Sequence, residues 1–575
     1  MKRMTGRLAA LALAALCSAS LAACAPSGSK PSAQQSSAAA GQTEPASAQP
    51  TASAAAAQDP LGKYDQTVTI RVGAIVSADT TFPDGETAED NRYTRLVKDK
   101  LNIVMETMWQ VGSGADFAQK MNLAIASNEL PDATVVSKVQ FRAMAKSNQL
   151  EELGPVIEAY GSDMMKAYLD TSNGDALKAA TYDGKVQGLP NVQADADGYH
   201  LLWVRKDWLD KLNLKVPTTV EEVKTVAKAF VDNKMAGSAK TIGLSGPQSG
   251  GKLYATFLES SNNTFGFDPI FSARHSYPGY WYQKDGAITY GSIQPETKQA
   301  LSDLRDMYAA GVIDQEMGVR ADAAEPVVSG QTGMFFGPWW IGYWPLPDAL
   351  KNDPDANWQA YAVPLDDQGS WTPHVAATTG MFTVVRKGYE HPEAIVKLAN
   401  LAIISEPTMD TSTLSFSFFP LRNTMGPTNE VQVTTTLLRK YLAGEVTADD
   451  LQKELGIYVG LKTDLDTVKA AKKEPYTDMN ITNWDISNEN FPRLYSMLVG
   501  AAPLIDTKAA AVSSVVYDQT DMMMKKWSTL KKLEDETFLK IITGSSPLDS
   551  FDDFVAQWKQ QGGDDILKEL ASVTQ

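Results

Sequence analysis

The sequence predicts an α/β protein divided into at least two lobes, each built on a parallel sheet with flanking helices. The length of the chain predicts more than one lobe, because it has 575 residues and a single hydrophobic core seldom contains so many. The order of the elements predicts the α/β class, because strand patterns and helix patterns alternate after residue 65. Such alternation is typical of parallel sheets, whose ligands bind outside the carboxyl ends of the strands.

The alternation is clearest at the start of the folded region. Apolar residues there change from every second position to helical spacing and back. Asn128 and Pro131 interrupt the second helical stretch, because neither residue favours a helix interior. The expected elements are a strand at 66–76, a helix at 91–101, a strand at 102–111, a helix from 115 to 127 and a strand at 132–136.

Later helices are indicated by the residues at their ends. Thr218 and Thr219 stand before Glu221 and Glu222, as in a capping box. Prolines near the start and glycines near the end mark the others. The expected helices are 220–230, 295–310, 391–403 and 550–562, and the region 430–540 is expected to be helical with polar loops.

Residues 1–23 have the pattern of a secretory signal peptide. Lys2, Arg3 and Arg7 precede a short run of small apolar residues, too short to span a membrane well. The run ends in "LAAC", and Cys24 stands where a bacterial lipobox has its lipidated cysteine. Cys24 is then expected to receive diacylglycerol and to become the acylated (palmitate) mature N-terminus. The alternative is an ordinary signal cleaved near an A-x-A motif, with Cys24 incidental.

Residues 24–64 are expected to form a disordered tether behind the lipidated Cys24. The segment has almost no large apolar side chain, so burial cannot offset the entropy of ordering it. About 35 such residues have a mean reach of roughly 30 Å. No later stretch offers the ~20 apolar residues of a membrane-spanning helix. The expected location is the extracytoplasmic face of the cell membrane, held there by lipid.

The composition excludes several classes of function. The formal net charge is −17, whereas a nucleic-acid-binding protein needs a basic surface. Cys17 and Cys24 are the two cysteines and both lie in the first segment, so the fold is expected to hold no disulfide and no thiol chemistry. The histidines have no metal-ligand spacing, and neither a metal nor a cofactor is expected; they are His200, His275, His374 and His391.

The stretch "GMFFGPWWIGYW", residues 333–344, is the strongest candidate for a binding site. A sugar ring has an apolar face, and an indole laid on it removes perhaps ~60 Å² from water, worth roughly 1.5 kcal/mol. Glycine and proline bend the backbone so that successive rings need not enter one core. Trp339, Trp340 and Tyr343 are therefore predicted to contact ligand. The alternative is that these rings fill the core of a lobe.

Five stretches that occur in one order along the chain carry a family resemblance. They are "TYDGKVQGLPNV" at 181–192, "LLWVRKDWLDKLNLKVPTTVEEV" at 201–223, "SGQTGMFFGPWW" at 329–340, "GMFTVVRKGYEHPEAIVKLANL" at 380–401 and "ETFLKIITGSSPLDSFDDFVAQWKQQGGDDI" at 536–566. Together they resemble the large extracellular solute-binding proteins of family 1, the lipoprotein receptors of carbohydrate ABC importers. Maltodextrin- and alginate-binding proteins are more distant kin. The resemblance covers nearly all of the chain from about residue 65.

The resemblance implies a two-lobed, periplasmic-binding-protein-like fold of type II with a helical C-terminal region. Crossovers are expected just after Pro190 and near Tyr361–Pro364. Lobe 1 would then comprise 65–190 plus 365–440, and lobe 2 would comprise 191–364 plus 441–575. The implied function is that of a monomeric receptor that closes on an oligosaccharide and delivers it to the membrane subunits of an ABC permease. The receptor performs no chemistry on the sugar.

Further candidates for the ligand site are weaker. In relatives the Trp after Gly-Pro stacks on a sugar, which is the place of Trp339, and Tyr254 resembles the position of a second stacking residue. Tyr199 and His200 follow the first crossover, so they are candidates to line the cleft. Trp109, Trp484 and Asp485 are candidates by residue type alone. Each of these is equally compatible with packing in a core.

No arrangement in the sequence indicates catalysis. Asp207 and Asp210 share one helix face, whereas a glycosidase needs two carboxyl groups across a cleft. The acidic residues after Asp353 do not continue as a calcium loop, since Trp358 and Pro364 stand at positions that need Gly and Glu. The alternatives left open are a receptor for a peptide or organic anion, an extracellular carbohydrate-active enzyme, and a sensor subunit for a membrane kinase.

Overall fold

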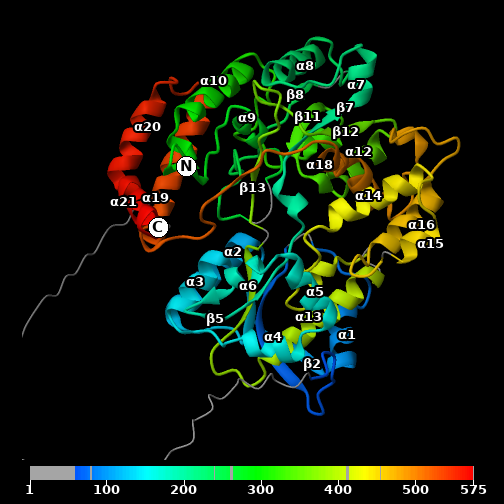
Figure 1. The fold of residues 1–575 in the computed structure, drawn as a ribbon, viewed down its shortest axis with the longest axis vertical. Coiled ribbons are helices and arrows are strands. Elements are labelled where there is room, and N and C mark those ends of the chain that lie inside the picture. The colour runs from blue at the N-terminus through cyan, green and yellow to red at the C-terminus, as the bar shows by residue number, and fades with distance from the viewer. Residues whose placement is uncertain are drawn as a thin grey trace, which may run out of the picture. The chain divides into compact units, whose positions relative to one another are not determined.

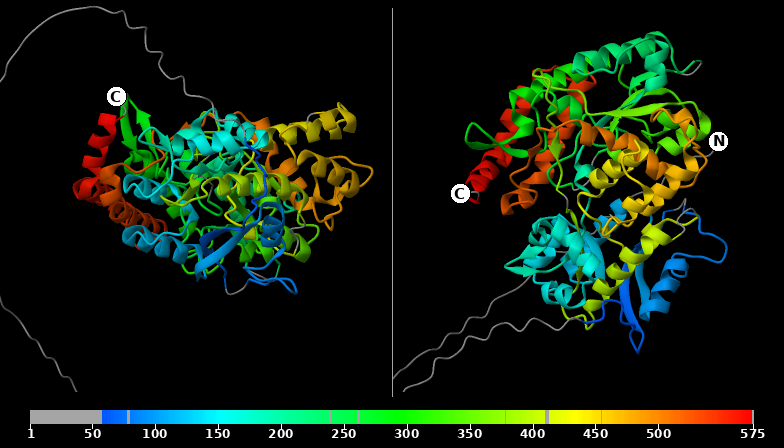
Figure 2. Two further views of the ribbon diagram at one scale, coloured as in Figure 1. Left: turned by 90° about the horizontal axis from the view of Figure 1, so that it is seen from below. Right: turned by 45° about the vertical axis from the view of Figure 1, so that its right-hand side comes forward.

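The protein is seen here as a computed structural model, which describes residues 58–77, 80–237, 240–259, 263–377, 379–409, 413–453 and 455–573. The predicted leader, Cys24 and the tether up to residue 57 lie outside the described residues. Residues 58–64, predicted as the end of the tether, are instead held by hydrogen bonds from Lys397 Nζ to the Gly62 carbonyl over 2.6 Å and from Asn400 Nδ2 to the Pro60 carbonyl over 3.0 Å. Two sheets carry most of the architecture of the described chain (Figures 1 and 2). They are named here the β14 sheet and the β7 sheet, after their central strands.

The βαβαβ pattern expected for residues 66–136 is confirmed. Its elements are β1 (Val68–Ile75), α1 (Arg92–Leu101), β2 (Ile103–Val111), α2 (Gly114–Ser127) and β3 (Ala133–Ser137). β1 and β2 run parallel, with Val68 opposite Ile103. β3 lies beside β1, because the Asp132 N–H donates to the Arg71 carbonyl over 2.9 Å. Alternating apolar residues thus form strands wherever helices follow to cover them.

The β14 sheet joins strands that are far apart in the sequence. β14 (Met381–Val385) lies between β3 and β6 (Leu189–Pro190) and is antiparallel to both. Phe382 pairs with Val136 on one side and with Pro190 on the other. Helices cover this region; they are α3 (Lys138–Lys146), α4 (Gly154–Tyr160), α5 (Asp163–Thr171), α6 (Asp175–Ala179) and α13 (Glu393–Ser405).

The β7 sheet has the strand order β12–β7–β11–β8. Its strands are β7 (Leu201–Arg205), β8 (Ile242–Leu244), β11 (Thr332–Gly337) and β12 (Trp358–Tyr361). β7 and β11 are buried along their whole length, which is the burial expected of strands covered on both faces. Helices α7 (Lys206–Lys211), α8 (Val220–Asp232), α9 (Asp268–Ser272), α10 (Pro295–Ala309), α11 (Glu325–Val328) and α12 (Leu346–Asn352) surround it.

The C-terminal helices complete the core beside the β7 sheet. α19 (Asp521–Ile542), α20 (Ser550–Trp558) and α21 (Asp564–Val573) pack near α10, as the red and green helices of Figures 1 and 2 show. The carboxylate of Glu534 is fully buried in α19 and accepts hydrogen bonds from the hydroxyls of Tyr254 and Tyr290. This network satisfies a carboxylate that would otherwise be costly to bury.

The region 430–540 is largely helical, as expected. Its elements are α14 (Glu430–Leu442), α15 (Ala448–Lys453), α16 (Leu461–Ala471), α17 (Phe491–Tyr495), the π-helical turn η7 (Ser496–Gly500), α18 (Ala502–Asp506) and β15 (Val512–Ser513). The capping box predicted before α8 is present only in part. The hydroxyl of the N-cap residue Thr219 accepts the N–H of Glu222, but the Glu222 carboxylate accepts the N–H of Thr218 rather than that of Thr219. No helix among the described residues has the length and apolar character that crossing a membrane requires.

The boundaries between lobes stay a prediction. The chain passes from β6 to β7 directly after Pro190, at the position expected for the first crossover. Beyond β12, β13 (His374–Val375) still pairs with β15 before the chain reaches β14. These contacts favour a second boundary that lies after Val375, later than the sequence indicated.

Gly500 provides a test of the packing between η7 and the end of β11. A Cβ atom added there would lie 1.9 Å from the carbonyl oxygen of Trp339, and overpacking of this kind costs about 1–3 kcal/mol or more. Gly500→Ala is therefore expected to lower the free energy of unfolding, measured by chemical denaturation, by at least about 2 kcal/mol. Gly318→Ala is the control, since its added Cβ meets nothing within 4 Å. Equal stability of the two variants would contradict this packing.

Candidate functional site

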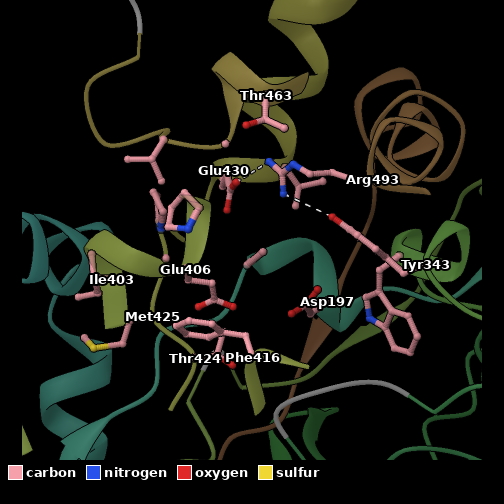
Figure 3. A pocket seen from close by; sticks show the side chains of 18 of the residues that line it. Asp197, Tyr343, Ile403, Glu406, Phe416, Thr424, Met425, Glu430, Thr463 and Arg493 are labelled. Carbon is pink, nitrogen blue, oxygen red and sulfur yellow. Dashed lines mark hydrogen bonds and ion pairs between the residues drawn. The ribbon is translucent and has the colours of Figure 1, made fainter. Parts of the chain in front are cut away.

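A cavity of about 1130 Å³ is lined by residues from both sheet regions, and we name it the aromatic cavity (Figure 3). Its volume exceeds the roughly 300–1,000 Å³ of ordinary small-molecule sites. Trp339, Trp340 and Tyr343, three of the residues predicted from sequence, line it together. The residues opposite and between them include Tyr168, Val192, Asp197, Ile403, Glu406, Phe416, Arg422, Thr424, Met425, Glu430, Thr463 and Arg493.

Trp339 is placed by the end of β11. The buried strand stops at Gly337, and the carbonyl of Pro338 accepts a 3.0 Å hydrogen bond from the indole N–H of Trp203. The next residue, Trp339, is only 7% exposed, and its own indole Nε1 donates to Asp197 Oδ1 over 2.7 Å. Trp339 is therefore a buried part of the cavity wall, and its indole N–H also fixes the position of the Asp197 side chain.

Trp340 and Tyr343 offer more free ring surface than Trp339. Trp340 is partly buried, and Tyr343 is 43% exposed. The ring of Tyr343 meets that of Trp339 edge-on, with centroids 6.4 Å apart. Exposed aromatic faces at the wall of a cavity can take a flat apolar ligand surface, and their polar tips remain available for hydrogen bonds.

The charged groups of the aromatic cavity are arranged in pairs. Arg493 Nη2 lies 2.9 Å from Glu430 Oε1, and its Nε lies 2.7 Å from the buried Asp464. Arg493 Nη1 also donates to the Tyr343 hydroxyl over 3.4 Å (Figure 3). Arg422 forms a second ion pair with Glu406. Each arginine of the cavity is thus already matched by a carboxylate.

Asp197 differs from the other acids of the cavity. Burial raises the pKa of Asp197 to about 6, and nearby Glu430 and Asp195 act in the same direction. The hydrogen bond from Trp339 opposes this shift by stabilising the charged form. Asp197 accepts its 2.7 Å hydrogen bond from a neutral donor, the indole of Trp339.

Tyr199 lies at a second cavity of about 620 Å³, named here the Tyr199 cavity. Its ring lies near that of Trp371, with centroids 5.4 Å apart. The other lining residues are mixed in charge and include Lys138, Arg142, Asp195, Tyr517 and Asp518. Arg142 and Asp518 form an ion pair with each other. The fold therefore separates Tyr199 from the aromatic cavity.

The remaining sequence candidates do not line the aromatic cavity. Tyr254 is 1% exposed and is bound to Glu534 in the core of the β7 region, and Trp484 is 0% exposed beside Tyr476 and Phe491. These two placements correct the prediction that Tyr254 and Trp484 contact the ligand, because both rings are packed in a core. Trp109 covers Gly73 and packs on Phe117, and Asp485 is exposed and accepts hydrogen bonds from Ser487.

His200 lines neither the aromatic cavity nor the Tyr199 cavity. It is buried next to Asp268 and His374, and burial lowers the pKa of His200 to about 4. The side chains of His200, Asp268 and His374 are the group among the described residues that could hold a metal ion. No two histidines are close in the sequence, so the fold alone brings this cluster together.

Sequence reasoning also missed the charged residues of the aromatic cavity. Glu430, Asp464 and Arg493 come from three different helices, and no local motif links them. Asp197 lies in an ordinary-looking "DADG" turn. Only the fold reveals that this turn meets the aromatic stretch.

Comparison with known proteins gives a family for this architecture. The family model described as bacterial extracellular solute-binding protein matches residues 99–438. Among similar structures is that of the alginate-binding protein AlgQ2, solved without calcium ion; it has a TM-score of 0.58 and 15% identity, and the match covers 89% of this chain and 98% of that one. The predicted α/β, two-lobed, periplasmic-binding-protein-like fold is confirmed. The expectation that each lobe is built on a parallel sheet is corrected, because β14 is antiparallel to β3 and β6, and β7 is antiparallel to β11 and β12.

Two curated proteins are similar over part of their length. The fructooligosaccharide ABC transporter substrate-binding protein FusA of Streptococcus pneumoniae serotype 4 is 26% identical over 285 residues, covering 46% of this chain and 48% of FusA. The polygalacturonan/rhamnogalacturonan-binding protein YtcQ of Bacillus subtilis is 24% identical over 225 residues, covering 38% of this chain and 41% of YtcQ. The chain therefore spans about half, or less, of the length of these curated relatives.

The raised pKa of Asp197 leads to a pH-dependent stability. Its pKa is about 6 in the folded protein and 3.8 ordinarily, so the folded state holds more protons between these values. Stability from this group is thus present below about pH 4 and is lost as pH rises through about 6. Asp197→Asn is expected to reduce the fall in melting temperature between pH 4.5 and 7.

The control for this measurement is Asp355→Asn, which replaces an exposed carboxylate. It is expected to leave the fall in melting temperature close to that of the unmodified protein. If Asp197→Asn and Asp355→Asn showed the same pH dependence, Asp197 would not be the buried acid described here.

Proposed function

The chain belongs to the bacterial extracellular solute-binding proteins, and from this premise we propose that it captures an oligosaccharide outside the cytoplasmic membrane and delivers it to an ABC permease. The observation that carries the proposal is the convergence of Trp339, Trp340 and Tyr343 on one large cavity with polar groups between them. FusA and YtcQ are named as proteins that bind carbohydrates, and the similarity to them supports the same class of ligand.

The aromatic cavity suits the two surfaces of a sugar. The apolar face of a pyranose or furanose ring can lie on Trp340 or Tyr343, and burying roughly 60 Å² there contributes about 1.5 kcal/mol. Asp197, Glu430 and Thr463 offer oxygen atoms to the hydroxyl rim. Because hydroxyl groups both donate and accept, carboxylates that are already paired with arginine can still accept from them.

The pairing of charges favours a neutral ligand. Arg493 is matched by Glu430 and Asp464, and Arg422 is matched by Glu406. An organic anion placed against either arginine would meet the carboxylate that is already paired there, and like charges repel. A neutral oligosaccharide meets no such repulsion. The observation thus disfavours the alternative of an anion receptor.

Delivery to a permease requires that the protein stay near the membrane. We infer that Cys24 carries the lipid and that the segment after it acts as the tether, with the folded part acting as a monomer. The similarity to the lipoprotein LipO of Bacillus subtilis, 24% identical over 226 residues, supports lipid anchoring. The permease would recognise the ligand-bound form, since a ligand that contacts both lobes stabilises their closed arrangement.

Binding without chemistry is part of the proposal. A glycosidase needs one carboxyl group with a raised pKa and a second free carboxylate across the bond. Asp197 meets the first condition, but Glu430 and Glu406 are each engaged by an arginine. The protein is therefore expected to release no reducing ends from any oligosaccharide that it binds. Release of reducing ends, lost in Asp197→Asn, would instead establish an enzyme.

The aromatic wall can be tested by calorimetry against neutral fructo-, xylo- and malto-oligosaccharides and acidic galacturonate oligomers. One neutral ligand is expected to bind with micromolar or tighter affinity. Trp340→Ala and Tyr343→Ala should each weaken it about tenfold, since roughly 1.5 kcal/mol of stacking is lost. Trp339→Ala should weaken it at least as much, because it also releases Asp197.

The control is Trp344→Ala within the same stretch. Trp344 is 42% exposed but lines a separate cavity of about 340 Å³ beside Phe265. Its removal is expected to leave affinity within about twofold of the unmodified protein. If Trp344→Ala weakened binding while Trp340→Ala and Tyr343→Ala did not, the aromatic cavity would not be the sugar site.

The lipid anchor is tested by fractionating cells that produce the Cys24→Ser variant. The full-length protein is expected in the membrane fraction, whereas the variant should be released, because serine cannot form the thioether to diacylglycerol. Once purified, the Cys24→Ser variant and the unmodified protein should bind sugar with equal affinity. Membrane association of Cys24→Ser equal to that of the unmodified protein would rule out this anchor.

A further inference from the structure

Three residues from distant parts of the chain meet in the core beside the β7 sheet. His200 directly precedes β7, Asp268 begins α9, and His374 begins β13. All three side chains are buried, at 4%, 1% and 2% exposure. Neither the aromatic cavity nor the Tyr199 cavity is lined by any of them. The cluster is therefore separate from the proposed sugar site.

The spacing of the ligand atoms matches a small cation. His374 Nε2 lies 3.2 Å from Asp268 Oδ1, and His200 Nε2 lies 4.0 Å from Asp268 Oδ2. One potential ligand atom from each residue lies within 4.8 Å of the other two. Tetrahedral Zn²⁺ with bonds of about 2.0–2.1 Å holds its ligand atoms roughly 3.3 Å apart, so small side-chain shifts would complete the site.

The polar atoms of the cluster are poorly satisfied by the protein itself. Within the described residues, Asp268 Oδ2 and both ring nitrogens of His374 are buried and have no hydrogen bond of acceptable geometry. Asp268 Oδ1 accepts the N–H of Ala255 over 2.7 Å, and His200 Nε2 accepts the N–H of Asn263 over 2.9 Å. Buried polar atoms are normally paired, and each exception needs a physical reason.

We propose that His200, Asp268 and His374 bind one Zn²⁺ ion in the folded state. Two imidazoles and one carboxylate are ligands that suit zinc, and with three protein ligands the fourth position is taken by water. Coordination satisfies Asp268 Oδ2 and one nitrogen of His374, and it replaces the Asn263 contact at His200 if Nε2 is the ligand.

The position of the site gives the ion a structural role. His200 ends the segment that joins β6 to β7, and His374 lies on the segment that joins β12 to β14. These segments touch, since a Cβ added to Gly198 would lie 3.1 Å from the backbone nitrogen of Ala376. Zn²⁺ would tie both segments to the start of α9. It would thereby fix the point where both connections leave the β7 sheet.

The test uses full-length mature protein without a histidine tag, stripped with a chelator and then titrated with Zn²⁺. Calorimetry is expected to show one ion bound per chain, and the melting temperature should rise because the ion binds the folded state. Substitution with Co²⁺ should produce the visible absorption of a four-coordinate site with nitrogen and oxygen ligands. This spectrum reports coordination even if a variant folds poorly.

His374→Gln and His200→Gln are expected to weaken Zn²⁺ binding by more than about 100-fold, beyond the roughly 10- to 100-fold effect of changing an outer-shell contact. His391→Gln is the control, because that side chain is 42% exposed and lies outside the cluster; it should bind Zn²⁺ like the unmodified protein. Absence of stoichiometric binding, or equal binding in His374→Gln and His391→Gln, would overturn the proposal.

Discussion

The hydrogen bond from the Trp339 indole to Asp197 is the constraint on which the candidate site depends. β11 is buried along its length, and the turn at Gly337 and Pro338 places Trp339 at the cavity. The indole N–H of Trp203 fixes that turn by donating to the Pro338 carbonyl. Asp197 lies on the segment between β6 and β7. The 2.7 Å bond therefore joins the end of a sheet to a chain connection, and it orients the wall on which Trp340 and Tyr343 stand.

The site combines a rigid wall with internally balanced charge. Arg493 links α17 to α14 and α16 through Glu430 and Asp464 and reaches the hydroxyl of Tyr343. A buried charge network of this kind is costly to disrupt, so it holds its members in place even where it adds little net stability. The position of the exposed Tyr343 ring is thus fixed by the contact of its hydroxyl with Arg493. A preformed wall reduces the entropy that is lost when side chains become ordered on binding, which increases the affinity of a solute receptor for its ligand.

Much of the fold could be predicted from the sequence because its helices and strands depend on residues that are close together in the chain. The alternation over 66–136, the Thr219 cap of α8 and the proline at the start of α10 each act within a few positions, and the structure has elements close to those expected. The site is less local. The family resemblance suggested Tyr254 and residue type alone suggested Trp484, but buried aromatic residues are found in cores as readily as at ligand sites, and both lie in cores. Arg493, Glu430 and the His200–Asp268–His374 cluster arise from long-range contacts that no short pattern encodes.

The central claim is that an oligosaccharide lies against the aromatic wall formed by Trp339, Trp340 and Tyr343. A crystal structure of the protein with the oligosaccharide that it binds most tightly tests this claim directly. The account predicts electron density for a sugar ring stacked on Trp340 or Tyr343, with its hydroxyls directed to Asp197 or the Arg493 network. Sugar bound at the Tyr199 cavity, with the aromatic cavity holding only solvent, would contradict it.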